Sequence, residues 1–149
     1  MQVTGVDFMA LPTQDFEASK EFYENVLGLE PSKRWGEMPA MEFETGNLTI
    51  AIMQSDAFGQ EFRKNAAPVA FHVDDVAAAR GELEAKGIDF VADTMDSGVC
   101  HMAIFTDPDR SPTQVLGQGN GMLVLVSDHH PNTATDGFRS ERRMGFGVV

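Results

Sequence analysis

The chain repeats itself, and this internal repeat constrains the fold more than any other feature of the sequence. Asp15 and Asp75 lie sixty residues apart, and each separates an apolar run from an amphipathic one. Gly28 and Gly87 end the two amphipathic runs. Self-similarity at a fixed spacing indicates two structural units, each too small to bury its own apolar face alone. The chain is therefore interpreted as a tandem duplication.

The second copy gives the clearest local prediction. Val69, Phe71 and Val73 alternate with smaller or polar residues, which is typical of a strand with one buried face. Asp74 or Asp75 can then cap a helix, because a carboxylate accepts the free N–H groups of the first turn. The first copy predicts a strand over residues 6–11 and a helix over 16–27 that is capped by Asp15. Gly28 is expected to end this helix, and Gly87 to end the helix of the second copy.

After its helix, each copy continues with three short apolar runs separated by turn residues. This pattern predicts antiparallel strands over residues 29–35, 41–44, 48–53, 88–92, 99–106 and 113–116. The expected fold is α+β, with two tandem βαβββ units that form a curved mixed sheet around a cavity. The units span residues 1–53 and 68–118 and are joined by a linker over 54–67. From Gly117 onward glycines are expected to end the last strand, and residues 119–149 are expected to form an irregular tail.

Charge and composition exclude several classes of partner. The formal net charge of −12 argues against binding to nucleic acid or to an anionic membrane surface. No run approaches the roughly 18 apolar residues of a membrane span, and the N-terminus lacks the pattern of a signal peptide. We expect a cytoplasmic protein. The single cysteine, Cys100, excludes an internal disulfide and a cysteine-rich zinc site.

Three segments, taken in order, resemble the vicinal oxygen chelate superfamily of glyoxalases, bleomycin-resistance proteins and extradiol dioxygenases. These segments are residues 18–29 (ASKEFYENVLGL), 70–76 (AFHVDDV) and 105–109 (FTDPD). The resemblance implies that the sheets curl around a cavity that receives a small molecule. It also implies association of two chains as a homodimer.

Metal-dependent members of that superfamily are similar in placing ligands on the first and last strands of each unit. Counted from the motifs, these positions fall on Phe8, near Ile50, on Pro68 and on Gln114. A hard divalent ion needs imidazole, carboxylate or carbonyl ligands, and only Gln114 offers one of these. We therefore expect no metal ligands of the usual kind and no cofactor, with a divalent metal at a relocated site as the alternative.

Two histidines are candidate catalytic residues. His72 is in phase with Pro68 on the expected cavity face, although a buried neutral imidazole without chemistry is the competing interpretation. The sequence does not assign the face of His101. If His101 also faces the cavity, the two histidines and Glu44 or Glu42 would form an acid/base cluster or an unorthodox metal site.

Several apolar residues of the first unit are candidates for a ligand pocket. The expected ligand-binding residues are Phe8, Trp35, Met53 and Gln114, and Met41 and Phe43 are weighed with them. Flat aromatic surfaces suit an apolar or planar organic molecule. In the competing interpretation, some of these side chains simply fill the core.

Three functions follow from these patterns. The leading hypothesis is a protein that binds a small organic molecule, as in the drug-sequestering branch of the superfamily. The alternative is a lyase, isomerase or dioxygenase with its chemistry relocated to His72, His101 and Gln114. The third is a duplicated structural domain that recruits another protein.

Overall fold

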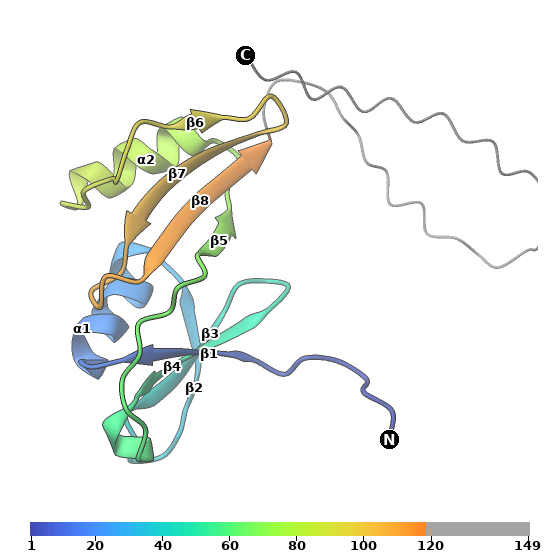
Figure 1. The fold of residues 1–149 in the computed structure, drawn as a ribbon, viewed down its shortest axis with the longest axis vertical. Coiled ribbons are helices and arrows are strands. Elements are labelled where there is room, and N and C mark those ends of the chain that lie inside the picture. Colours follow the sequence, from blue (N-terminus) through green and yellow to red (C-terminus); the bar gives the residue numbers. More distant parts are fainter. Residues whose placement is uncertain (119–149) are drawn as a thin grey trace, which may run out of the picture.

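A computed structural model describes residues 1–118, and the expected irregular tail over 119–149 lies outside the described residues. Two four-stranded mixed sheets are each accompanied by one longer helix (Figure 1). The prediction of an α+β fold with two tandem βαβββ units is confirmed. None of the helices among residues 1–118 is long and apolar enough to cross a membrane.

The first unit has the strand order β1-β4-β3-β2, with β1 parallel to β4 and the other pairs antiparallel. Its elements are β1 (Met9–Thr13), α1 (Phe16–Glu21), the π-helical turn η1 (Phe22–Val26), β2 (Glu30–Arg34), β3 (Ala40–Glu44) and β4 (Thr49–Gln54), followed by the 3₁₀ turn η2 (Asp56–Phe58). The second unit repeats this topology in the order β5-β8-β7-β6. Its elements are β5 (Val69–His72), α2 (Val76–Ala85), β6 (Met95–Asp96), β7 (Cys100–Thr106) and β8 (Pro112–Gln118).

The helix caps are those that the sequence predicts. Asp15 Oδ1 accepts the N–H of Ala18 at 3.1 Å, and Asp75 Oδ1 accepts the N–H groups of Ala77 and Ala78 at 2.9 and 3.0 Å. Gly28 and Gly87 follow the two helices with φ of +71° and +85°. This left-handed conformation favours glycine, because a Cβ atom would crowd the following carbonyl.

Several predicted strands differ from the structure. The first runs over Met9–Thr13 instead of residues 6–11. Residues 88–92 form only an isolated bridge, between Phe90 and Phe105, and the short strand β6 follows instead at Met95–Asp96. Gly117 does not end the last strand, because β8 continues to Gln118. At Gly117 a Cβ atom would lie 2.6 Å from the carbonyl oxygen of Val73, so glycine is required there for close approach of two backbones.

Each sheet has a helix side, packed against α1 or α2, and an outer face on the opposite side. The side chains on the two helix sides join one apolar core. Phe22 of the first unit contacts Phe105 of the second, with ring centroids 6.3 Å apart. The helix sides therefore meet across the boundary between the units. The two outer faces are turned away from this shared core, and the two sheets of the described residues are not closed into one.

The loop between β7 and β8 fastens the second unit to the first. Asp109 Oδ1 accepts the backbone N–H of Gln14 at 3.0 Å, next to the start of α1. Asp107 Oδ2 accepts a hydrogen bond from the hydroxyl of Tyr23 at 3.3 Å. Figure 1 shows this loop beside α1. On the other side of the boundary, Lys86 Nζ donates to the carbonyl of Val26 at 2.7 Å.

Candidate ligand site on the sheet faces

Three aromatic rings gather on the outer face of the first sheet. Phe8 precedes β1, Trp35 follows β2 and Phe58 ends η2, so three separate segments bring them together. The Trp35 ring lies edge-on to Phe8 at 5.4 Å and to Phe58 at 6.1 Å between centroids. Phe8 keeps 36% of its surface exposed. Edge-to-face packing holds the rings in place and leaves apolar surface accessible to another molecule.

Glu42 of β3 orients the tryptophan. Its Oε1 accepts a hydrogen bond from Trp35 Nε1 at 2.7 Å and lies 4.0 Å from Lys33 Nζ. Trp35 and Glu42 are both partly buried, and burial strengthens a hydrogen bond to a carboxylate. The indole is therefore fixed in its plane by a polar contact at its edge.

Apolar residues form the part of this face that lies over β1 and the adjoining ends of β4 and β3, whereas Glu44, paired with Glu30 and Thr49, lies on the same face farther along β3. Strand register pairs Ala10 with Ala51, Pro12 with Met53 and Ala40 with Met53, and these residues share a side with Glu42. Met41 and Phe43 occupy the other side and are buried in the core. Of the apolar residues weighed from the sequence, Phe8, Trp35 and Met53 thus lie on the outer face, whereas Met41 and Phe43 do not. Phe58 was not among the ligand-binding residues that the sequence predicted, and its contact with Trp35 is found only in the structure.

The outer face of the second sheet carries His72 and Gln114. Ala70 pairs with Gln114 and His72 with Leu116, and Gln114 pairs in turn with Ile104 of β7. His72 and Ala70 are exposed, and Gln114 is half-buried. The imidazole of His72 therefore lies on a partly apolar surface, as the phase of β5 predicts, and is not buried.

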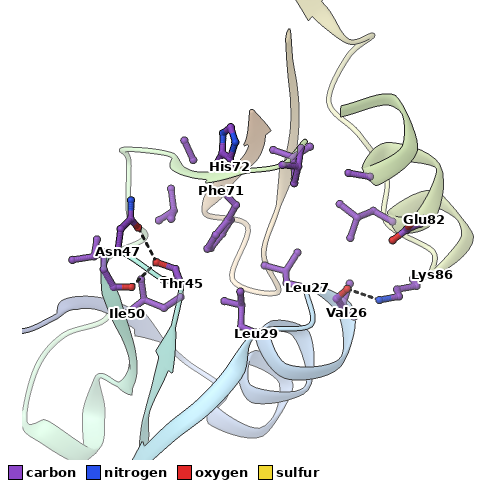
Figure 2. Close-up of a pocket in the computed structure, with 18 residues that line it drawn as sticks. Val26, Leu27, Leu29, Thr45, Asn47, Ile50, Phe71, His72, Glu82 and Lys86 are labelled. Atoms are coloured by element: carbon purple, nitrogen blue, oxygen red, sulfur yellow. Dashed lines mark hydrogen bonds between the residues drawn. The ribbon is translucent and has the colours of Figure 1, made fainter. Parts of the chain in front are cut away.

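A separate cavity of about 720 Å³ lies on the helix sides, between the two units (Figure 2). Leu27, Leu29 and Ile50 line it from the first unit, and Phe71, Leu83 and Val115 line it from the second. In Figure 2 the Phe71 ring points into this space, and the imidazole of the adjacent His72 points away from it. The sequence did not predict this cavity, because its walls combine residues from both units.

The profile of the Glyoxalase/Bleomycin resistance protein/Dioxygenase superfamily matches residues 5–115. The chain belongs to this superfamily. The match spans both repeat units and agrees with the resemblance seen in the three sequence motifs. Among curated proteins there is no significant match to the chain.

Several solved structures have the same fold as this superfamily member, although their sequences are less than 25% identical to it. A glyoxalase/bleomycin resistance protein/dioxygenase from Nocardioides is 24% identical, with a TM-score of 0.65 over 82% of this chain and 88% of that chain. Lactoylglutathione lyase from Agrobacterium tumefaciens is 17% identical, with a TM-score of 0.65 over 78% of this chain and 95% of that one. A fosfomycin resistance protein from Listeria monocytogenes is 17% identical, with a TM-score of 0.64 over 80% and 97%. These similarities establish the fold and not the reaction.

Strand register identifies the position near Ile50 at which metal-dependent members of the superfamily place a ligand. Ile50 itself pairs with Met9 on the helix side and is buried in the core. Ala51 pairs with Ala10 as Gln114 pairs with Ala70, so Ala51 is the equivalent outer-face position on β4. The outer-face set is then Phe8, Ala51, Pro68 and Gln114. One amide and three side chains without a donor atom do not fit a divalent ion. Within residues 1–118, no three His, Cys, Asp or Glu side chains gather closely enough to hold a metal.

The structure does not bring the three candidate catalytic residues together within one chain. His101 shares the helix side of its sheet with Ala103 and Phe105, opposite to His72. Its Nε2 lies 3.3 Å from Asp96 Oδ2, and hydrogen bonds from Gly98 and then His101 lower the pKa of Asp96. Glu44 accepts a hydrogen bond from Thr49 Oγ1 at 3.0 Å on the first sheet. The catalytic roles of His72, His101 and Glu44 stay predictions.

Proposed function

We propose that this superfamily member binds an apolar or planar organic molecule against the outer face of its first sheet, without the superfamily's usual metal ligands. The arrangement of Phe8, Trp35 and Phe58 carries this proposal. Three rings held at fixed angles above alanine and methionine side chains offer a preformed apolar surface, and little conformational entropy is lost when a flat ligand packs on it.

Glu42 adds a polar feature at the edge of this surface. Its Oε1 is engaged by Trp35 Nε1, and Lys33 Nζ lies near the same oxygen. Glu44 lies on the same face of β3, so carboxylates outnumber Lys33 there, and a planar ligand with one hydrogen-bond donor or a positive charge would be favoured over an anionic ligand. Apolar walls with a few placed polar groups are typical of small-molecule sites.

A second copy of the chain is proposed to complete the site. Within residues 1–118, β1 pairs only with β4 and β5 only with β8, so each strand has a free edge. Ala10, Ala70 and His72 on the outer faces are exposed. If β1 paired with β5 of a partner subunit, the first sheet of one chain and the second sheet of the other would form one continuous sheet. Gln114 and His72 of the partner subunit would then face the aromatic cluster.

Ligand binding can be followed directly, because Trp35 is the single tryptophan of the chain. A series of planar aromatic compounds, neutral, cationic and anionic, is titrated while the fluorescence of Trp35 is recorded. We expect saturable quenching by neutral or cationic compounds, and its loss in Met53→Glu. The matched control is Met38→Glu, an exposed methionine in the turn after Trp35. Quenching unaffected by Met53→Glu, or absent throughout the series, would contradict the proposal.

Metal content provides the second test. Protein purified without a metal-affinity tag is analysed by plasma mass spectrometry, alongside Gln114→Ala and His72→Ala variants. We expect substoichiometric metal in all three. Stoichiometric metal that is lost in either variant would favour metal-assisted lyase, isomerase or dioxygenase chemistry instead.

A further inference from the structure

We infer that the cavity between the helix sides of the two units is a second small-molecule site, which accepts an uncharged apolar molecule. This site is distinct from the aromatic surface of the proposed function, because it lies on the opposite side of the first sheet and shares with the outer faces only Ala70 and His72, at the edge of β5. Its volume of about 720 Å³ falls within the range of roughly 300–1,000 Å³ typical of sites that enclose small organic ligands.

The walls are apolar and come from both units. Leu27 and Leu29 follow the end of η1. Both are only partly buried, although they pack against the buried core. Phe71 of β5 is likewise partly buried, and Figure 2 shows its ring pointing toward Leu27 and Leu29 across the open space. Apolar side chains that face each other across such a space gain dispersion contacts and lose exposed surface when an apolar molecule enters.

The charged groups at one end disfavour a charged ligand. Lys86 Nζ donates to the carbonyls of Val26 and Asn25 at 2.7 and 3.1 Å, so its charge is directed at the end of η1. Glu82, one turn earlier on α2, is an exposed carboxylate at the rim. An anion would be repelled by Glu82 and by the net charge of −12. A cation would give up its hydration without a buried carboxylate to replace it.

The opposite end of the cavity is lined by polar, uncharged side chains. Thr45 Oγ1 donates to the carbonyl of Leu48 at 2.5 Å and contacts Asn47 Oδ1 at 3.3 Å. These contacts close the turn between β3 and β4, which forms this end of the cavity. A ligand therefore meets hydroxyl and amide groups here and no formal charge.

Strands β4 and β8 separate this cavity from the outer faces. Ile50 and Val115 line the cavity, whereas their neighbours Ala51 and Gln114 lie on the outer faces and do not line it. At the free edge of β5 the two sides meet, and Ala70 and His72 line the cavity together with Phe71. Adjacent residues in a strand point to opposite sides of the sheet. Substitutions can therefore be placed on one site without contacting the other.

The experiment uses N-phenyl-1-naphthylamine, an uncharged apolar probe whose fluorescence rises in an apolar environment. It is titrated into the full chain and into Ala79→Phe, in which a phenyl ring from α2 would occupy the cavity. The matched control is Ala78→Phe, because Ala78 is the preceding residue on the same helix, is exposed and does not line the cavity. Leu27→Trp fills the cavity from the opposite wall if Ala79→Phe fails to fold by circular dichroism.

We expect saturable binding by the wild type and by Ala78→Phe, with Kd raised at least about tenfold in the filling variant. Binding in Met53→Glu is expected to equal that of the wild type. Weakening by Met53→Glu but not by Ala79→Phe would put the probe on the outer face and overturn the inference. Absence of binding by the full chain would also overturn it, because the cavity would then be closed to ligands, whether by a second copy or by the chain itself.

Discussion

The hydroxyl of Tyr23 donates a hydrogen bond to Asp107 Oδ2 at 3.3 Å, and this contact joins the two repeat units at a buried position. Burial is the main cause that raises the pKa of Asp107, and the N–H of Ser111 opposes it by donating to Oδ1 at 2.7 Å. Burial, followed by the charge of Asp107, raises the pKa of Tyr23. The pair therefore holds the β7–β8 loop of one unit against η1 of the other.

Tyr23→Phe is expected to destabilise the fold by about 1–3 kcal/mol, because Asp107 then lacks one hydrogen-bond donor in a buried setting. The phenyl ring keeps the contacts of Tyr23 with Phe22 and Phe43. Urea unfolding monitored by circular dichroism measures the loss. In an Asp107→Asn background the same substitution should cost less, because the acceptor carries no charge. Equal costs in the two backgrounds would show that the charge of Asp107 does not strengthen this hydrogen bond, and no loss for Tyr23→Phe in the wild-type background would show that the hydrogen bond does not contribute.

Asp107→Asn is expected to become more favourable, relative to the wild type, as pH rises. The pKa of Asp107 is raised in the folded state, so the contribution of this group to stability is complete below the pKa of the unfolded chain. This contribution is lost as pH rises through the pKa of the folded state. Asparagine does not titrate, and its amide oxygen can still accept the N–H of Ser111. The free energies of unfolding of the wild type and of Asp107→Asn are compared at about pH 3.5 and about pH 7. A difference that is constant with pH would contradict the raised pKa.

Asp75→Ala is expected to destabilise the second unit by about 0.5–2 kcal/mol, because two N–H groups at the start of α2 lose their acceptor. Asp75 Oδ1 accepts both of them. The adjacent Asp74 is exposed and makes no cap contact, so Asp74→Ala is the matched control, with the same change in charge. The measurement is the thermal midpoint of each variant. Similar losses for both would attribute the effect to charge instead of to the cap.

The sequence predicted what local chemistry determines. A carboxylate before an amphipathic run and a glycine after it specify the ends of each helix, and Asp75 and Gly87 lie where these rules place them. Strand phase likewise put His72 on the outer face. Alternation in β3 puts Met41 on the side opposite to Glu42, but it does not say which side meets the helix; the pairing of Met41 with Ile52 in the core decides that.

The way in which the two units pack against each other could not be predicted from the sequence. Asp107 accepts the N–H of Ser111 within its own turn, but Asp107 and Asp109 also contact the first unit through Tyr23 and Gln14. Contacts between residues so distant in sequence leave no periodic signal. The cavity between the helix sides was not predicted for this reason.

Gly117→Ala and Gly81→Ala are expected to change stability in opposite directions. At Gly117 a Cβ atom would lie 2.6 Å from the carbonyl oxygen of Val73 and 3.0 Å from Cγ2 of Val76. The first of these is a backbone atom, so relief requires β8 to separate from the segment before α2, at a cost of about 1–3 kcal/mol. At Gly81, within α2, the Cβ atom would meet nothing within 4 Å, and alanine should stabilise the helix by about 0.5–1 kcal/mol. Urea unfolding of the two variants checks both signs, and a stabilising Gly117→Ala would mean that β8 does not lie against Val73.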